Sequence, residues 1–248
     1  MIRILLLCKS LILLFALSAS ALDLSQLTDD ERALLRAEVR SYLLDNPEVL
    51  FEAARIYQER QSEIEAQAEQ RAISELSEAL FSDSASWAGG NLEGDVTLVE
   101  FLDYRCGYCR RAAPEVEQLV ETDGNIRLVV KEFPILGDES VLMSRFAIAT
   151  LQIAGAAAYK QVHDRLIELQ NPISNDTLRD LANDLNLKSD EIIAHMEHDS
   201  VSEVLLQNRA LAQRLNISGT PAFVLSDRVI RGFLPAADML EVIEELRS

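Results

Sequence analysis

Two cysteines three positions apart are the residues of this sequence with the clearest capacity for chemistry. Cys106 and Cys109 enclose Gly107 and Tyr108, and the one other cysteine in the sequence is Cys8. A C-x-x-C pair commonly binds zinc or exchanges disulfides. Structural zinc takes four protein ligands, but no second cysteine pair and no histidine at a distinctive spacing accompanies this motif. We therefore predict a redox-active pair that uses no metal and no other cofactor.

Copper is the metal that two thiolates alone could still hold, because Cu(I) favours soft sulfur ligands. The sequence has no Met-rich or His-rich cluster that would mark a dedicated copper site. We expect its three histidines, His163, His195 and His198, to have surface or packing roles. Binding of Cu(I), for copper delivery or protection, is therefore kept as an alternative function.

The residues around the cysteine pair predict a strand that ends, and a helix that begins, at the motif. Residues 96–102 (VTLVEFL) are typical of a buried strand. A helix that begins at Cys106 places its sulfur among unpaired N–H groups, which with the helix dipole favour thiolate over thiol. Cys109 lies one turn later and can reach back to it. We therefore predict that Cys106 is an exposed nucleophile, and that the more buried Cys109 resolves the mixed disulfide that Cys106 forms with a client protein.

The sequence after this helix predicts a second strand and then a block of helices. Residues 126–133 (IRLVVKEF) are the second predicted strand. The first helix of the block is expected over residues 140–154, where Gly155 ends it. Apolar spacing predicts further helices after it, and a capping box at Ser200 and Glu203 predicts the start of the last one. Helices between strands indicate an α/β fold.

The end of the chain predicts a β-hairpin followed by a helix. Residues 222–225 and 228–231 are short apolar segments around a Ser-Asp turn, and residues 235–246 have helical spacing. Before the first strand, residues 82–95 are rich in Ser, Gly, Asp and Asn and predict a connecting loop, in which Trp87 is a packing residue. The element order is therefore β, α, β, a block of helices, β, β, α.

Residues 22–81 predict an all-helical N-terminal arm. Thr28 and Glu31 form a capping box, and the Asn-Pro-Glu run at 46–48 restarts the helix with Asn46 as its N-cap. The arm has two apolar patches separated by a charged run, and a segment of this length has little room for a core of its own. We predict that it is a self-association module, the alternative being a surface helix packed on the next domain.

The first 21 residues are typical of a secretory signal peptide. They combine Arg3 and Lys9 with an apolar stretch and a small-residue cleavage pattern at Ala19 and Ala21. An uncleaved membrane anchor is the alternative, but Lys9 leaves the apolar stretch shorter than the ~20 residues that span a membrane. Cleavage would leave the C-x-x-C pair as the only cysteines, and we expect the protein in the periplasm of a Gram-negative bacterium.

The charge of the chain disfavours one class of partner. The 248 residues include 41 acidic and 23 basic side chains, for a formal net charge of −18. Nonspecific nucleic-acid binding requires clustered Lys and Arg that neutralise phosphates. We therefore expect no nucleic-acid partner.

With these features the chain resembles the thioredoxin superfamily, and within it the DsbA-like branch of periplasmic thiol–disulfide proteins. Pro114 lies where thioredoxin-like active-site helices have a kinking proline, and Glu100 lies at the place of the family's buried carboxylate. The resemblance implies that Glu100 helps to move a proton to or from Cys109. Residues 219–223 (GTPAF) resemble the family's loop, whose proline, here Pro221, has a cis peptide bond and faces the cysteines.

The resemblance covers residues 83–248 and extends more weakly over the arm. The EFPILG run at 132–137 and the helical block are as in DsbA-like proteins, and residues 42–53 are similar to the N-terminal segment of ScsC-type (suppressor of copper sensitivity C) proteins. The resemblance implies an α/β thioredoxin fold with a helical insertion at about 138–216. The domains we expect are a signal peptide at 1–21, the helical arm and linker at 22–81, and the DsbA-like domain at 82–248.

The residues beside the cysteines bear on the direction of exchange. Gly107 and Tyr108 with Thr220 depart from the Pro-His dipeptide and valine of strongly oxidising members, and resemble isomerases and ScsC-type proteins. Independently, the residue before Pro221 presents backbone groups with which an extended client can pair. We predict a homo-oligomeric disulfide isomerase or reductase, a dimer or trimer through its arm, that acts on secreted cysteine-containing clients and is recycled by a membrane redox partner. A DsbA-like dithiol oxidase is the alternative.

Overall fold

The computed structural model describes residues 26–248, and the predicted signal peptide lies outside them. The chain divides into two compact units between Gln61 and Ser62. We expected the helical arm to extend to residue 81, and the structure instead includes residues 62–81 in the second unit.

The first unit contains helix α2 (Asp29–Asp45) and the beginning of helix α3 (Glu48–Glu75). The predicted capping box is confirmed, because the Thr28 N–H donates to Glu31 Oε2 at 2.8 Å and the Glu31 N–H donates to Thr28 Oγ1 at 3.3 Å. The helix restarts at Glu48, but the expectation that Asn46 is its N-cap was wrong. Asn46 Nδ2 donates to the Tyr42 carbonyl at 2.9 Å, so its side chain closes α2 instead.

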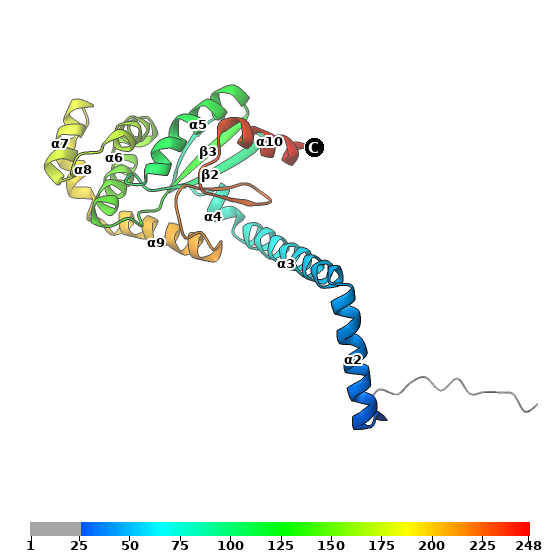
Figure 1. Ribbon diagram of the computed structural model, residues 1–248. Coiled ribbons are helices and arrows are strands. Elements are labelled where there is room, and N and C mark those ends of the chain that lie inside the picture. The colour runs from blue at the N-terminus through cyan, green and yellow to red at the C-terminus, as the bar shows by residue number, and fades with distance from the viewer. Residues whose placement is uncertain (1–25) are drawn as a thin grey trace, which may run out of the picture. The chain divides into compact units, whose positions relative to one another are not determined.

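The second unit is built on a five-stranded sheet with the order β1-β3-β2-β4-β5, of which Figure 1 labels β2 and β3. Only β2 and β3 are parallel, in a register that pairs Val96 with Ile126 and Leu102 with Glu132. The other neighbours pair antiparallel. The strands are β1 (Trp87–Gly90), β2 (Val96–Leu102), β3 (Ile126–Glu132), β4 (Ala222–Val224) and β5 (Val229–Arg231).

Helices cover both faces of this sheet. Side chains alternate along β2, so Leu98 packs with α5 and α10, whereas Val99 packs on the opposite face with α9, α4 and the end of α3. Helices α6 to α8 form a further apolar cluster with the end of β2. The helices of this unit are α4 (Ser77–Phe81), α5 (Gly107–Asp123), α6 (Asp138–Glu168), α7 (Asn175–Asp184), α8 (Ser189–His195), α9 (Asp199–Arg214) and α10 (Ala236–Arg247).

The predicted connecting loop at 82–95 contains strand β1, which the sequence analysis missed. Trp87 is buried, as expected of a packing residue, and its Nε1 donates to the Ala156 carbonyl at 3.0 Å. Its ring lies across Gly89, where a Cβ would come within 2.1 Å of the indole. A glycine, which disfavours a strand by propensity, is therefore needed at position 89 to make room for the tryptophan.

The helical block confirms one expectation and departs from another. Gly155 has a φ of 83° and a ψ of −179°, which are not helical, so the helix expected to end at Gly155 does end there, and α6 is two helices joined by a kink at this residue. The predicted capping box at Ser200 and Glu203 was wrong, because α9 begins at Asp199 with His198 as its N-cap. The His198 ring accepts a hydrogen bond from the Ser200 N–H at 3.2 Å, and a histidine is not among the usual capping residues.

The end of α3 and helix α4 hold their place by packing on the sheet. Ile73 and Leu80 are fully buried among apolar side chains of β2 and β3. Glu69 of α3 accepts hydrogen bonds from the Val229 N–H at 2.8 Å and from Arg231 at 2.6 Å, and so covers the open side of β5. These contacts explain why residues 62–81 belong to the second unit.

We expect the substitution Leu80→Ala to lower the free energy of unfolding by about 2–5 kcal/mol, because it opens a cavity against the sheet. Urea denaturation followed by circular dichroism measures the change. Leu206→Ala on α9 is the matched control, since Leu206 is 66% exposed and its truncation should change stability by no more than about 0.5 kcal/mol. Equal effects of the two substitutions would show that α4 does not depend on this packing.

Candidate redox site

Cys106 lies at the N-terminus of α5, directly after the loop that follows β2. It is the N-cap of the helix, and its backbone N–H donates to the Asp103 carbonyl at 3.0 Å. The Cys106 Sγ donates to the Thr220 carbonyl at 3.1 Å. The predicted placement at a helix N-terminus is confirmed, but the expectation of an exposed sulfur was wrong. The residue is 8% exposed and Cys109 is 1% exposed, because the Thr220 loop lies against Cys106.

The surroundings give the two cysteines opposite acidities. Burial raises the pKa of Cys106, but its contact with Thr220 and the N–H groups of Cys109 and Tyr108 at the start of α5 outweigh burial and hold the pKa below its usual value. Burial raises the pKa of Cys109 well above its usual range, and the nearby Glu100 carboxylate raises it further. The arrangement therefore favours a thiolate at Cys106 and a thiol at Cys109.

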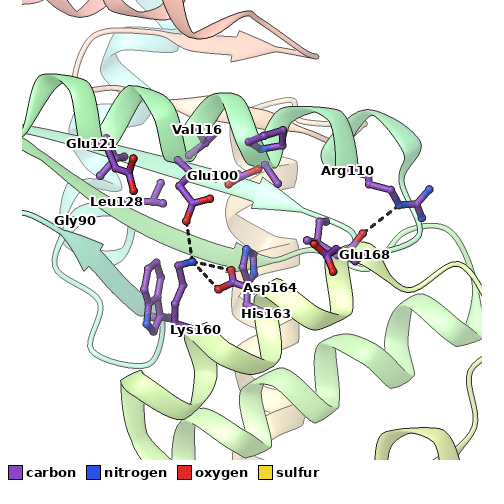
Figure 2. Close-up of a pocket in the computed structure, with 16 residues that line it drawn as sticks. Gly90, Glu100, Arg110, Val116, Glu121, Leu128, Lys160, His163, Asp164 and Glu168 are labelled. Carbon is purple, nitrogen blue, oxygen red and sulfur yellow. Dashed lines mark hydrogen bonds and ion pairs between the residues drawn. The ribbon is translucent and has the colours of Figure 1, made fainter. Parts of the chain in front are cut away.

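Glu100 lies on β2 beneath the cysteines, as the resemblance led us to expect. It is 5% exposed, and burial together with the charge of Glu132 raises its pKa to about 8. A carboxyl group with such a pKa can accept or release a proton near neutral pH. It also lines a cavity of ≈ 560 Å³ between α5 and α6 (Figure 2), beside Lys160 and His163.

The loop before β4 brings Thr220 and Pro221 to the cysteines. The Thr220–Pro221 peptide bond is cis, as expected from the resemblance. Strand β4 pairs antiparallel with β2, so that Phe101 lies opposite Ala222 and the preceding loop lies at the end of β2 where α5 begins. Pro114 lies inside α5.

The two residues between the cysteines differ in their surroundings. Gly107 is the first residue of α5, and a Cβ at this position would meet nothing within 4 Å. Tyr108 is exposed, and the Arg111 guanidinium lies 4.2 Å from the centre of its ring. The dipeptide therefore leaves the surface beside Cys106 open.

Asp103 is a buried residue of this site that the sequence analysis missed. Its Oδ1 accepts from the Arg105 N–H at 2.8 Å, and its Oδ2 accepts from the N–H groups of Ile135 and Leu136 at 2.8 and 3.0 Å. Asp103 thus ties the loop before Cys106 to the loop after β3. An aspartate directly after a buried apolar strand was the available signal.

A cluster around Glu132 was also missed. Tyr104, Tyr159 and Ser144 donate to its carboxylate at 2.6 to 2.8 Å, and all are buried. His163 has the packing role that we expected, because its ring stacks on Tyr159. Partners far apart in sequence form this cluster, so that no local pattern marks it.

Metal ligands do not gather elsewhere in the part of the chain that the structure describes. No group of three or more His, Cys, Asp or Glu side chains in residues 26–248 could hold a metal ion. His195 and His198 stack on each other with ring centroids 4.7 Å apart at the surface. The alternative of Cu(I) at the cysteines stays a prediction of the sequence.

The fold and the cysteine site define a thioredoxin-type domain with a helical insertion, and comparison with known proteins specifies the family. The family model of the DSBA-like thioredoxin domain matches residues 97–246, and the chain belongs to this family. The model of the copper resistance protein ScsC N-terminal domain matches residues 31–63. The second match covers the N-terminal helices.

Solved structures agree with this assignment. A thioredoxin-like oxidoreductase from Silicibacter pomeroyi is 37% identical, with a TM-score of 0.64 over 68% of this chain and 96% of that chain. Proteus mirabilis ScsC in a transitional conformation is 28% identical, with a TM-score of 0.64 over 88% of this chain and 98% of that one.

Curated sequences are similar over a shorter stretch. The Na(+)/H(+) antiporter NhaA 3 of Salinispora tropica is 30% identical over 139 residues, which are 56% of this chain and 21% of that protein. The chain spans about a fifth to a quarter of the length of the first curated relatives that it matches.

We expect iodoacetamide at pH 7 to modify Cys106 at least about tenfold faster than Cys109, because the thiolate is the reactive form and the two pKa values are shifted in opposite directions. Mass spectrometry of tryptic peptides after short exposure measures the two rates. Unfolding in urea is the control and should make the rates similar. Faster modification of Cys109 in the folded protein would contradict the assignment.

Glu100 should make the stability of the protein depend on pH. Its pKa is raised from 4.5 to about 8 in the folded state, so the folded state holds this proton while the unfolded state loses it. The stability due to Glu100 is therefore fully present below about pH 4.5 and is lost as the pH rises towards 8. We expect Glu100→Gln to be more stable than wild type by about 4 kcal/mol at pH 8 and to show little difference at pH 4.5, measured by urea denaturation. An equal difference at both pH values would contradict the raised pKa.

Proposed function

We propose that this protein is a thiol–disulfide oxidoreductase in which Cys106 is the nucleophile and Cys109 the resolving cysteine. The Cys106 thiolate attacks one sulfur of a client disulfide, the client S–S bond breaks, and the other client sulfur leaves as a thiolate. Cys109 then loses its proton and attacks Cys106, which releases the second client thiolate. Two electrons pass to the client, and the Cys106–Cys109 disulfide remains.

The observation that carries this proposal is the opposite acidity of two cysteines one helical turn apart. Cys106 has a lowered pKa at the start of α5, and Cys109 has a raised pKa behind it. A structural disulfide within one turn would constrain almost nothing and would not need this asymmetry. Membership of the DSBA-like family supports the same activity.

The loop at Thr220 and Pro221 is suited to bind an extended client segment. The Thr220 carbonyl contacts the Cys106 sulfur at 3.1 Å, so that a client strand pairing with this loop would pass the nucleophile. Tyr108 offers an exposed aromatic surface beside it. We assign client binding to this loop, and tuning of the Cys106 thiolate to Gly107, Tyr108 and Thr220.

Isomerisation or reduction is the direction that we favour, with dithiol oxidation as the alternative. An isomerase must keep Cys106 reduced so that it can attack wrong disulfides. Gly107, Tyr108 and Thr220 together resemble isomerases and ScsC-type proteins, and the similarity to Proteus mirabilis ScsC supports the same type. In isomerisation a client thiolate attacks the mixed disulfide and releases Cys106 without a net transfer of electrons, whereas reduction ends with the Cys106–Cys109 disulfide.

Self-association through the N-terminal helices is part of this proposal. No residue of α2 is buried, and large apolar side chains on α2 and α3 are more than 40% exposed, among them Leu35, Val39, Leu50 and Phe51. Leu35, Val39 and Leu50 line an apolar groove of ≈ 440 Å³. An exposed patch of this kind marks an interaction site, and the groove fits a second copy of the same helices, in a dimer or trimer.

The proposed location is the periplasm of a Gram-negative bacterium. The N-terminal sequence features of a signal peptide support it, and so does the family resemblance. Secreted proteins with cysteines would be the clients, and a membrane redox partner would recycle the cysteine pair. Disulfides form and persist in this compartment.

We expect the protein to reactivate ribonuclease with scrambled disulfides in a glutathione buffer, and Cys106→Ser to abolish this. The double substitution Val39→Lys and Leu50→Lys should reduce the molecular mass measured by light scattering to that of one chain. It should also lower the reactivation rate at least about tenfold while leaving reduction of insulin unchanged, since facing sites are needed to hold a misfolded client.

The matched control is a double substitution of exposed polar residues on the same helices that do not line the groove, Arg32→Ala and Glu52→Ala, which should change neither mass nor rate. Oxidation of fully reduced ribonuclease without reactivation of the scrambled form would favour the oxidase. Absence of both activities would reject the proposed function.

A further inference from the structure

Glu132 is a second buried carboxylate beneath the cysteine pair. Glu132 pairs with Leu102 in the parallel register of β2 and β3, and Glu100 lies two residues before Leu102. Because side chains alternate along a strand, Glu100 and Glu132 project from the same face of the sheet. They are 5% and 3% exposed.

The two carboxyl groups differ in their hydrogen bonds. Glu132 Oε1 accepts from the hydroxyls of Tyr104 and Tyr159 at 2.7 and 2.6 Å, and its Oε2 accepts from Ser144 at 2.8 Å. Three donors on one carboxyl group stabilise its charged form, so that burial raises the pKa of Glu132 only to about 7, below that of Glu100. Glu100 makes no hydrogen bond or ion pair to a side chain within the described residues. Of these two neighbouring buried carboxyl groups, Glu100 is therefore the one that stays neutral.

Among residues 26–248, no cation compensates the charge near this pair. Lys160 faces the cavity beside Glu100, but it is bound to Asp164 at 2.7 Å and to Glu117 at 3.4 Å. His163 lies 3.1 Å from the Tyr104 hydroxyl, and burial lowers its pKa to about 4, which leaves it neutral. The negative charge on Glu132 therefore acts on Glu100 without a neutralising partner.

The other charged and titratable groups around the pair come from three elements. Cys109 of α5 faces Glu100, and Asp103, in the loop after β2, adds to the negative charge near Glu132. The charged groups of α5 that line the cavity are Arg110, Glu117 and Glu121. Those of α6, besides the two described above, are Asp164 and Glu168 (Figure 2).

We propose that Glu132 is a positioning residue for disulfide exchange: it carries the negative charge of the buried pair and thereby keeps Glu100 protonated as the proton donor to Cys109. This inference rests on the proposed function. When a client or partner thiolate attacks Cys106 of the disulfide, the S–S bond breaks and Cys109 leaves as a thiolate. The O–H bond of Glu100 then breaks, an S–H bond forms at Cys109, and Glu100 regains a proton from water through the cavity. In the opposite direction, the Glu100 carboxylate takes the proton of Cys109 before Cys109 attacks.

The experiment follows the ionisation of Glu100 itself. The reduced protein is labelled with ¹³C at the glutamate carboxyl carbons, the Glu100 resonance is assigned by its loss in Glu100→Gln, and its titration is recorded by NMR. We expect Glu132→Gln to lower the midpoint by about one pH unit or more, because a neighbouring charge is removed. Tyr159→Phe, which removes one donor but keeps the ring, should lower it by less. Glu121→Gln is the matched control, since Glu121 is exposed at the cavity mouth, and it should leave the midpoint unchanged.

A kinetic measurement connects this titration to exchange. Release of glutathione from a mixed disulfide at Cys106 requires Cys109 to lose its proton, so its pH profile should shift in Glu132→Gln by the same amount as the Glu100 midpoint. Glu132→Gln should cause no shift of this pH profile when it is introduced into the Glu100→Gln variant. A Glu100 midpoint that does not change in Glu132→Gln and Tyr159→Phe overturns the inference, whether or not the protein exchanges disulfides. If wild-type protein forms no mixed disulfide, the proposed function fails, and the kinetic role of Glu132 fails with it.

Discussion

The pairing of β2 with two neighbours of opposite direction is the constraint on which the site depends. Its parallel pairing with β3 places the carboxyl ends of both strands at one edge, and its antiparallel pairing with β4 brings the start of β4 to the same edge. Helix α5 begins there, so Cys106 meets the Thr220 carbonyl at 3.1 Å. Segments 114 residues apart in sequence thus meet at one sulfur.

Asp103 stabilises this end of the sheet because its carboxylate accepts hydrogen bonds from backbone N–H groups that have no partner in a strand or helix. A loop buried at the end of a sheet leaves N–H groups without partners, and each such group is costly. The Asp103 carboxylate accepts three of them, from Arg105, Ile135 and Leu136. The loop that carries Cys106 is therefore rigid because a side chain replaces the missing strand partner.

The sequence was informative wherever the pattern is local. The bounds of β2, the helix that begins at the cysteines and the hairpin of β4 and β5 follow from apolar runs and short spacings. The burial of Glu100 and the cis bond at Pro221 came from family resemblance, because nothing in their neighbours requires them. Strand β1 was missed since Gly89 is there to make room for the Trp87 ring, a tertiary demand that overrides propensity.

The cap of α9 and the Glu132 cluster are two further features that the sequence did not predict. A side chain at His198 caps the helix where Ser200 was expected, and the choice depends on the path by which the chain enters the helix. Tyr104, Ser144 and Tyr159 converge on Glu132 from two elements that meet only in the folded state. Such clusters are recognised only in the folded structure, because each member is an ordinary residue in its own segment.

Buried charges on the two faces of the sheet show how structural and reactive groups differ. Lys131 is fully buried on one face, where its Nζ is bound to Asp83 at 2.6 Å and to the Ala79 carbonyl at 2.8 Å. Its charge is paired, and so it can hold α4 and the following loop in place. Glu132, the next residue, projects to the other face, where no cation of the described residues pairs with Glu132 or Glu100. An unpaired buried carboxyl is costly to ionise. The same cost brings the pKa of Glu100 to about 8, close to the pH at which it must exchange a proton with Cys109.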